Sequence, residues 1–508
     1  MRGYLRAMRR CGLGGLVVGI LLAALPATAA AGDRSVAWQV DVAHTGSLRA
    51  PGLSPPFTQA WARDLPGWAS YPILAEGKVF VVVSDVTGDT PYGRDVYALD
   101  QGSGATVWVR HIEGPYWRGA LAYDAGRLFV VGYDGIVYAL SPSDGSVLWH
   151  ASLPTAYSLA SAPVAANGRL LYTAGSNGGP TVGALDEADG HLLWGDLVSL
   201  GSGTPALDGD RLYVAGGSPS ADALSARTGA VLWDHPGGSS GSGVLTAVGA
   251  GRLWLWTESS PGAGWLFDLT TGASAGSFSS PTVPAIDGDV VAMRSGSGVW
   301  AQDPGGRHLW DVDLGRELTS PPLIANGVVL VGALDGTLTG LDLGTGRMVW
   351  SANVGAGVTG TSPAQAVNSL GGLGGGDGLL IVPAQQRVVA FRGSEAPAAR
   401  TAAPRDRLVG VPARVRWRTL TRRGLAVRVR LIAGATIRAR VSGHRGTRSA
   451  WSSLGRATRR VPRAETVRVR LRVSHRPRRR PTRARVTVSI ARGNDARIDL
   501  RATLRIVP

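Results

Sequence analysis

The stretch that decides the fold is Ala98-Leu99-Asp100-Gln101-Gly102-Ser103-Gly104-Ala105-Thr106-Val107-Trp108. An Ala-Leu-Asp triplet is followed by a glycine, and a tryptophan stands four residues after that glycine. With small departures the pattern recurs, and the glycine and tryptophan of its copies are Gly145 and Trp149, Gly190 and Trp194, Gly229 and Trp233, Gly306 and Trp310, and Gly346 and Trp350. Phe267-Asp268 with Gly272 is a degenerate copy in which Gly276 replaces the tryptophan. Most tryptophans follow one another at about 40 residues, a repeat length typical of propeller blades.

Each repeat also has a regular interior. A proline precedes a short apolar run, an Asn-Gly or Asp-Gly pair and a second apolar run, as in Pro163 with Asn167-Gly168 and Pro322 with Asn326-Gly327. Asn-Gly readily takes positive φ at both positions, which suits a two-residue hairpin turn. We therefore expect four antiparallel strands in each repeat. Sheets of this kind bury their faces by packing around a ring.

The repeats predict eight blades if the two ends of the repeat region combine. Trp61 stands in the last-strand position of a unit whose first three strands are missing. Ser362-Pro363 and residues 379–382 and 388–391 supply three strands without a fourth. We expect the strand at residues 57–62 to complete the last blade, because an open ring would expose two sheet edges.

The repeat resembles the tryptophan-docking repeat of PQQ-like, or quinoprotein alcohol dehydrogenase-like, propellers. Residues 38–46, with Ala43-His44-Thr45-Gly46, are similar to the start of such domains, so the resemblance covers residues 37–394. In that family each repeat tryptophan packs between neighbouring blades. The resemblance implies the same docking role for Trp61, Trp108, Trp149, Trp194, Trp233, Trp310 and Trp350.

The resembling family contains both enzymes and scaffolds, so its fold alone does not decide the activity. Its quinoprotein dehydrogenases hold a metal ion beside the quinone with carboxylate and amide oxygens, use a carboxylate base and typically carry a vicinal disulfide. Cys11 is the one cysteine of this chain, so that disulfide cannot form, and a Cys-x-x-Cys-His haem motif is absent. The resemblance favours the non-enzymatic branch, with no catalytic, cofactor-binding or metal site. A PQQ-dependent quinoprotein oxidoreductase is the alternative.

Residues 1–31 have the pattern of a secretory signal peptide. Arginines between Arg2 and Arg10 precede an uncharged apolar run at residues 12–25, and small residues suited to cleavage follow. The run is shorter than the about 20 apolar residues of a membrane span. Cys11 precedes the run, whereas a lipoprotein cysteine would follow it. We expect a secreted or extracytoplasmic protein whose mature chain has no transmembrane span.

Five aromatic residues are the candidate ligand surface. Trp68, Tyr71, Tyr116, Trp117 and Tyr157 fall in loops that enter the innermost strands of the first three blades. Such loops share one face of a propeller, where aromatic rings could stack on a sugar or a peptide side chain. The expected partner is a protein or a glycan. Ordinary packing of the loops is the competing interpretation.

Other chemical signals are weaker. Asp85, Asp89 and Asp95 could hold calcium in one loop, but solvated loop carboxylates are the simpler interpretation. A Gly-x-Ser-x-Gly pattern at residues 237–241 lies in a loop and not between a strand and a helix, which argues against a nucleophile elbow. Residues 371–376 are expected to form a flexible glycine-rich loop.

The chain changes character after residue 394. Residues 395–412 are expected to be a proline-containing linker, and residues 413–508 a separate domain. From residue 401 onward the sequence holds 30 arginines and four carboxylates, so the net charge of +17 combines an acidic body with a basic end. Residues 427–431 and 467–473 alternate apolar residues with arginine, the period of a strand with one buried face. Several such strands favour an immunoglobulin-like sandwich.

The arginine face has two interpretations. In the first, it is a solvated surface whose arginines reflect a biased amino-acid composition. In the second, it attaches the protein to an anionic cell-wall polymer by diffuse electrostatic attraction. Nucleic acid is not expected, because Trp417 and Trp451 are the only aromatic residues there that could stack on bases. The sequence thus predicts an exported, non-catalytic binding or scaffold protein. Its basic domain is expected to attach it to the cell envelope.

Overall fold

Two compact units, Met1–Ala396 and Pro397–Pro508, make up the chain in a computed structural model. The residues that the structure describes are 32–84, 93–114, 118–132, 134–153, 156–157, 161–176, 181–196, 203–216, 220–237, 244–257, 262–361, 369–395, 407–410, 414–423, 425–430, 435–444, 452–461, 466–471, 483–491 and 498–507. The expected signal peptide lies outside them. Within them, no helix has both the length and the apolar character that crossing a bilayer requires.

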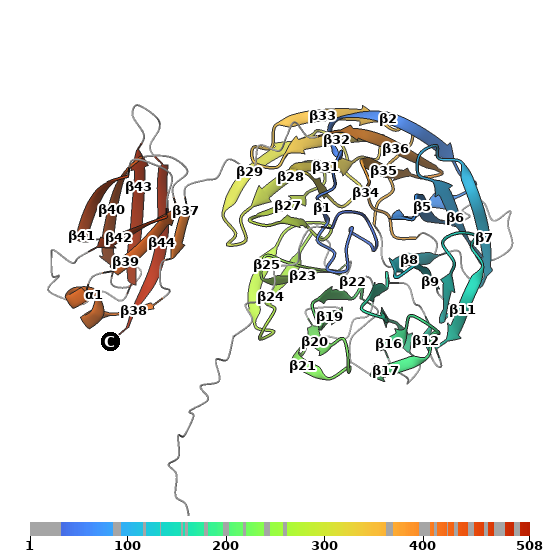
Figure 1. Ribbon diagram of the computed structural model, residues 1–508, viewed down its shortest axis with the longest axis horizontal. Helices are drawn as coiled ribbons and strands as arrows, with labels where there is room; N and C mark the ends of the chain where they lie inside the picture. Colours follow the sequence, from blue (N-terminus) through green and yellow to red (C-terminus); the bar gives the residue numbers. More distant parts are fainter. Residues whose placement is uncertain are drawn as a thin grey trace, which may run out of the picture. The chain divides into compact units, whose positions relative to one another are not determined.

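Eight antiparallel sheets of the first unit surround an axis as blades, numbered here in chain order (Figure 1). The strands of blades 1 to 4 are β3 (Trp68–Ala69), β4 (Ile73–Ala75), β5 (Lys78–Ser84), β6 (Gly93–Asp100) and β7 (Thr106–Glu113); β8 (Gly119–Asp124), β9 (Arg127–Gly132), β10 (Ile136–Leu140) and β11 (Val147–Ser152); β13 (Val164–Ala166), β14 (Arg169–Thr173), β16 (Val182–Asp186) and β17 (Leu192–Asp196); and β18 (Ala206–Asp208), β19 (Arg211–Gly216), β20 (Ser220–Ser225) and β21 (Val231–His235). A separate short pair consists of β12 (Ala156–Tyr157) and β15 (Gly175–Ser176).

The other four blades complete the ring. Their strands are β22 (Val244–Gly249), β23 (Arg252–Thr257), β24 (Gly264–Asp268) and β25 (Ser274–Phe278); β26 (Ala285–Asp287), β27 (Val290–Arg294), β28 (Gly298–Gln302) and β29 (His308–Asp313); β30 (Leu323–Ala325), β31 (Val328–Gly332), β32 (Thr337–Asp342) and β33 (Met348–Asn353), with β1 (Ser47–Leu48) beside β30; and β34 (Gly374–Gly376), β35 (Leu379–Ala384), β36 (Arg387–Ser394) and β2 (Ser54–Asp64). The all-β, eight-bladed propeller expected from the repeats is confirmed.

Local sequence explains how a blade forms. Asn167 and Gly168 have φ values of 57° and 75° between β13 and β14, so the Asn-Gly pair makes the expected hairpin turn. The inner strands are mostly apolar and buried, because neighbouring blades cover both of their faces. The outer strands alternate: in β11, Leu148 is exposed and Trp149 is half-buried. The core therefore lies between the blades, and one row of each outer strand faces solvent.

The eighth blade combines both ends of the repeat region. β2 pairs antiparallel with β36, with Trp61 opposite Ala390. The Trp350 indole of blade 7 donates to the Phe57 carbonyl at 3.0 Å and lies edge-on to the Phe57 and Phe391 rings. The sheet order β2-β36-β35-β34 makes β2 the outer strand of the last blade.

The innermost strand of blade 8 is β34, so the expected flexible loop at residues 371–376 is wrong for Gly374–Gly376. A side chain has no room there: a Cβ on Gly374 would lie 2.7 Å from Pro72, and one on Gly376 would lie 2.6 Å from the Cβ of Arg34. The glycines let this strand approach its neighbours closely. Ser362-Pro363, which we expected to begin this blade, lies outside the described residues.

Seven tryptophans span neighbouring blades. In each contact the indole N–H donates to a backbone carbonyl of the next blade at 2.8–3.0 Å. In six of them the ring covers a buried glycine whose Cβ would come within 2.5–2.7 Å of the ring. These pairs are Trp61 with Gly104, Trp108 with Gly145, Trp149 with Gly190, Trp194 with Gly229, Trp233 with Gly272, and Trp310 with Gly346. The repeated glycine and tryptophan are therefore the two halves of one inter-blade contact.

The junction between blades 5 and 6 differs from the other seven. Gly276 stands at the tryptophan position and Gly306 is exposed, and a Cβ on either would have no described residue within 4 Å. Nearer the axis the two blades do touch, since a Cβ on Gly249 would lie 2.9 Å from Ile286. This junction is packed inside and open at its rim.

Residues 32–50 run around the axis at the centre of the ring, drawn in blue in Figure 1. The buried Trp38 anchors this N-terminal segment by donating its indole N–H to the Gly371 carbonyl at 3.2 Å. Backbone hydrogen bonds tie the segment to the inner strands of seven blades. They join Leu74 N to Ser35 O, Tyr123 N to Val36 O, Leu207 N to Val42 O, Val248 N to Ala43 O, Ile286 N to Thr45 O, Ile324 N to Gly46 O, and Ser35 N to Gly375 O. The segment thereby closes the axis near the hairpin turns that follow the inner strands.

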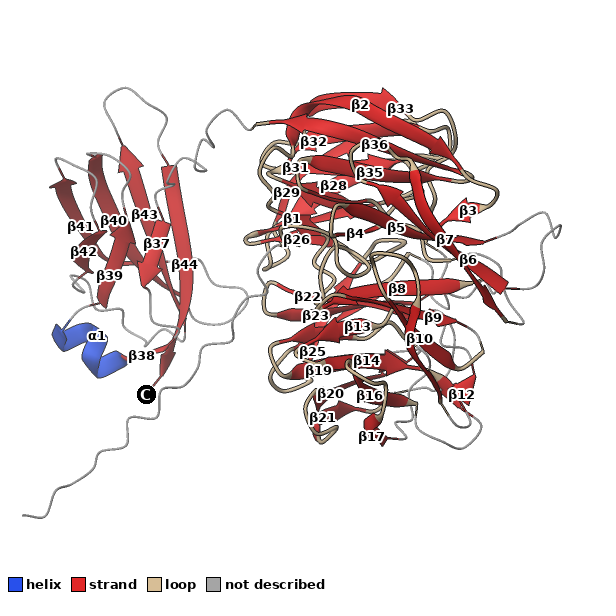
Figure 2. Ribbon diagram, turned by 45° about the vertical axis from the view of Figure 1, so that its right-hand side comes forward, coloured by secondary structure: helices blue, strands red, loops and turns tan. Residues whose placement is uncertain are grey.

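The second unit contains two sheets, shown with its helix in Figure 2. One has the order β37 (Arg407–Gly410), β39 (Leu425–Arg430) and β42 (Thr466–Leu471), and the other β38 (Arg414–Arg416), β44 (Ile498–Val507), β43 (Arg483–Ala491), β40 (Ala435–His444) and β41 (Ser452–Val461). A short helix, α1 (Trp417–Arg423), follows β38. β37 falls within residues 395–412, which were expected to be a linker. Leu408 pairs with Val429, so this part of the expected linker is a strand of the three-stranded sheet.

Candidate functional site

A groove of about 750 Å³ lies over blades 5 to 7. Its walls are the loops that enter β26, β30 and β34 and the turn between β27 and β28. The lining residues that carry polar or aromatic chemistry are Ser279, Ser280, Arg294, Ser295, Trp300, Glu317, Thr319 and Thr361.

Arg294 holds one wall of the groove in place. Its guanidinium donates to the Leu318 carbonyl at 2.8 Å and to the Thr319 carbonyl at 3.1 Å. Burial lowers the pKa of Arg294 to about 10, against the opposing effect of the nearby Glu317 charge, so the guanidinium stays charged at neutral pH. Its Nε–H is buried and has no hydrogen-bond partner among the described residues.

The loop that Arg294 holds is also tied to the next loop. The Thr319 hydroxyl donates to the Val358 carbonyl at 2.7 Å, which joins the loop before blade 7 to the loop before blade 8. Trp300 is half-buried and contributes an aromatic surface, while Glu317 contributes a carboxylate. The groove therefore combines one ring, charges of both signs and several hydroxyls on fixed loops, a mixture suited to binding and not to a single reaction.

The repeat contains a signal for this groove that the sequence reasoning missed. Arg294 stands six residues after the turn glycine Gly288, at the end of a buried strand. At the same distance from their turn glycines the other blades carry small or apolar residues, such as Gly132, Ala174 and Ala333. A buried arginine at a position that is otherwise small departs from the repeat, and superposing the repeats would have found it.

Of the five aromatic residues predicted to form a ligand surface, the structure describes the side chains of Trp68 and Tyr71. Tyr71 is fully buried between two blades, where its hydroxyl donates to the Leu121 carbonyl and accepts from the Leu121 amide at 2.7 Å. Tyr71 is therefore removed from the ligand surface, because the neighbouring blade covers its ring. Trp68 is half-buried at the start of blade 1. Tyr116, Trp117 and the side chain of Tyr157 lie outside the described residues.

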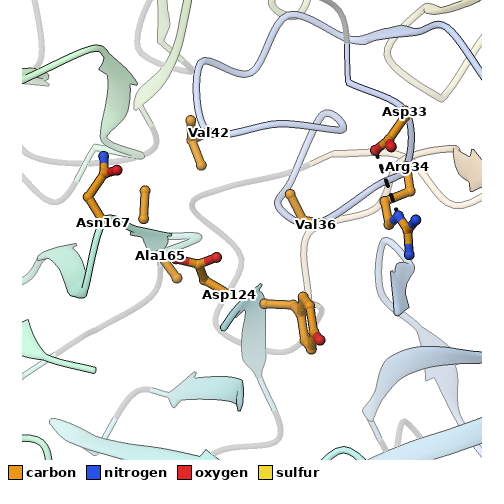
Figure 3. Close-up of a pocket in the computed structure, with 9 residues that line it drawn as sticks. Asp33, Arg34, Val36, Val42, Asp124, Ala165 and Asn167 are labelled. Atoms are coloured by element: carbon orange, nitrogen blue, oxygen red, sulfur yellow. Dashed lines mark ion pairs between the residues drawn. The ribbon is translucent and has the colours of Figure 1, made fainter. Parts of the chain in front are cut away.

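A second, smaller depression of about 430 Å³ lies beside the N-terminal segment (Figure 3). Val36 and Val42 form one side, and Asp124 and Asn167 of blades 2 and 3 form the other. The segment passes here from blade 2 to blade 4. At the edge of the depression, the side chains of Asp33 and Arg34 form an ion pair at 3.7 Å. Asp124 is the acidic residue on the side formed by the blades.

Glu187 is buried near this second depression. Its carboxyl group lies beside Asp124, and the Glu187 backbone carbonyl accepts the Trp149 indole N–H at 3.0 Å. Burial, together with the charge of Asp124, raises the pKa of Glu187 to about 7. The docking contact between blades 2 and 3 therefore holds a carboxyl group that changes its charge near neutral pH.

Among the described residues, one group of three carboxylate or imidazole side chains could share a metal ion. It consists of Asp186, Asp189 and His191, on the turn before the outer strand of blade 3. Of the expected calcium loop, Asp85 and Asp89 lie outside the described residues, and Asp95 pairs with His111 at 2.8 Å.

Comparisons with known proteins place the fold and the family. A relative named outer membrane protein assembly factor BamB, from Yersinia pestis, is 27% identical over 51% of this chain and 59% of its own length. Tetrathionate hydrolase from Acidithiobacillus ferrooxidans is 23% identical over 61% of this chain and 69% of its own length. The structure of quinohemoprotein alcohol dehydrogenase from Comamonas testosteroni, 15% identical, covers 71% of this chain and 80% of that chain with a TM-score of 0.53. That last likeness shows the propeller fold alone.

The family assignment rests on a longer match. The chain spans only 34% and 59% of the length of the first two assembly factors that it matches. The family described as outer membrane protein assembly factor BamB, in contrast, matches residues 93–249 and 241–417, which is more than half of the chain. The match begins at β6 of blade 1 and continues past β36, the last strand of blade 8 in the sequence. This protein is therefore a member of the PQQ-like repeat family described as outer membrane protein assembly factor BamB.

Proposed function

We propose that this chain is an extracytoplasmic, non-catalytic scaffold that binds an extended segment of a partner protein in the groove over blades 5 to 7. The observation that carries the proposal is the fixed wall of the groove, where buried Arg294 binds two loop carbonyls. The hydroxyls that line the groove offer hydrogen bonds to the backbone of an extended segment, and Trp300 offers a surface for one of its side chains. The family assignment supports a role in assembly.

The second unit, in this proposal, keeps the scaffold at the cell envelope. We take residues 37–394 as the propeller and residues 413–508 as an immunoglobulin-like sandwich, with the strand β37 added to that domain. The expected signal peptide and the arginine excess after residue 401 support an anionic cell-wall polymer as the attachment point.

Site-specific photocrosslinking in the native host tests the groove. A photoreactive residue at Ser279 or Thr361, both in the groove, should give one discrete protein adduct. The matched control places the same residue at Leu148, which is 50% exposed on the outer rim of blade 2. Adducts of equal yield from the rim, or none from the groove, would overturn the proposal. A glycan ligand would give no protein adduct.

A redox assay tests the non-catalytic part of the proposal. Purified protein incubated with PQQ and calcium should gain no dye-linked dehydrogenase activity on alcohols or sugars. Turnover that requires added PQQ would establish the oxidoreductase alternative instead.

A further inference from the structure

The five-stranded sheet of the second unit carries all but one of its described arginines on one face, the exception being Arg459, which pairs with Ile437. Neighbouring residues of a strand point to opposite faces of the sheet. Every second residue of a strand therefore shares a face with the residues paired with it in the next strand. Val486, Val488 and Leu500 lie on one face of this sheet. The other face includes Thr458, which is exposed, and Ser442, which is half-buried. We call it the cationic face.

One row of the cationic face is basic in every strand that it crosses. Arg414 of β38 pairs with Arg505 of β44, Arg505 pairs with Arg483 of β43, and Arg483 pairs with His444 of β40. Neighbouring strands lie about 4.8 Å apart, so the row places basic residues about 5 Å from one another. Like charges directly opposite one another in a sheet are unfavourable. Such a row is best tolerated when anions lie across it.

A second basic row lies further along the same face. Arg456 pairs with Arg440, Arg440 with Thr487, and Thr487 with Arg501. Between the two rows stand hydroxyl residues and one more arginine, in the order Ser442, Arg485 and Thr503. Asp499 is the one carboxylate on this face within the described strands.

We infer that the cationic face binds an extended phosphodiester polymer without bases, in a track formed by these two rows. This inference rests on the attachment role proposed above and names the residues that perform it. Arginine forks match phosphate oxygens, and serine and threonine hydroxyls donate to the same oxygens. The described strands of this face contain no aromatic residue on which bases could stack, which favours a polyol phosphate over a nucleic acid.

Binding of the full-length mature chain to soluble poly(glycerol phosphate) tests the track. The variant Arg483→Gln with Arg505→Gln removes two charges from the first row. The matched control, Arg428→Gln with Arg468→Gln, removes two arginines that stand directly opposite one another in the three-stranded sheet. Both variants lose the same net charge and the same kind of like-charge pair. The track variant should weaken binding at least about tenfold at 0.1 M salt and should flatten the dependence of log affinity on log salt by roughly 1.4, while the control changes affinity less than about threefold.

Each outcome decides the inference. Equal losses in the two variants would mean that diffuse net charge, and not the track, binds the polymer, and tighter binding of single-stranded DNA than of poly(glycerol phosphate) would mean that bases are recognised. Absence of polymer binding by the wild type would remove the attachment role, while a groove adduct in the crosslinking experiment would still stand. Unchanged melting temperatures of both variants exclude misfolding as the cause of a loss.

Discussion

At the scale of single residues, the glycine and tryptophan of the repeat carry the packing between blades. Trp149 covers Gly190, where a Cβ would lie 2.5 Å from the ring, and its N–H reaches the Glu187 carbonyl. Trp149→Ala should lower the free energy of unfolding by about 3–5 kcal/mol, the range for large aromatic residues removed from a core. Leu148→Ala, at an exposed position of the same strand, should change it by less than about 1 kcal/mol. Equal melting temperatures for Trp149→Ala and wild type would contradict the docking role.

Glu187 gives the same junction a pH dependence. Its pKa is raised from 4.5 to about 7, so between these values the folded state holds a proton that the unfolded chain releases. The contribution of Glu187 to the free energy of unfolding is therefore most favourable below pH 4.5, and it becomes less favourable as the pH rises towards 7. Glu187→Gln should remove that loss and stabilise the protein at pH 8 by roughly 1–3 kcal/mol relative to wild type. Urea unfolding of both proteins at pH 5 and pH 8 measures it, and a gain of equal size at both values would contradict the assignment.

At the scale of elements, the junction between blades 5 and 6 is the least fastened part of the ring. β25 has no tryptophan over the next blade, and Gly276 and Gly306 leave its rim open. Backbone amides of β25 should therefore exchange with solvent faster than those of β21, which Trp233 fixes to blade 5. Hydrogen exchange followed by mass spectrometry compares the two strands directly. Equal protection would show that the inner contact alone secures this junction.

The elements show which part of the structure could be predicted from the sequence. Hairpins such as Asn167-Gly168 and contacts such as Trp149 on Gly190 depend on short sequence patterns that recur from repeat to repeat. The sequence therefore predicts them. Strand β34 could not be predicted in this way. Three glycines have no strand preference of their own, and close packing against Pro72 and Arg34 makes them a strand.

The candidate site was predictable to a smaller extent. Loops that enter the inner strands were expected to form the binding face, and the groove does lie among such loops. The residues differ, because exposure depends on the neighbouring blade: Tyr71 is covered by Leu121 of blade 2, whereas Trp300 keeps part of its ring accessible. Aromatic character alone therefore could not separate a packing residue from a surface residue.

At the scale of the whole molecule, charge is divided between the two units. The net charge is +17, with 30 arginines after residue 401. The full chain should bind a heparin column at 0.1 M salt and elute well before 1 M, because the Debye length falls from about 10 Å to 3 Å over that range. A chain that ends at Ala396 should not be retained. Retention of this shorter chain, or retention insensitive to salt, would contradict a basic domain that acts through exposed charge.

The path of the N-terminal segment also has a consequence for the order in which the protein can be completed. Ser35 is held by Leu74 and by Gly375, and Gly46 is held by Ile324. A ribosome or an export channel releases the chain from its first residue onward, so these early residues must wait for partners that emerge some three hundred positions later. During that interval the N-terminal segment has only a fraction of its final contacts. The early blades then lack both this segment at the axis and the blade that closes the ring. The residues that leave first are therefore among the last to be secured, and any interruption of synthesis before blade 8 leaves an unclosed arc whose axis is exposed to proteases and to other nascent chains.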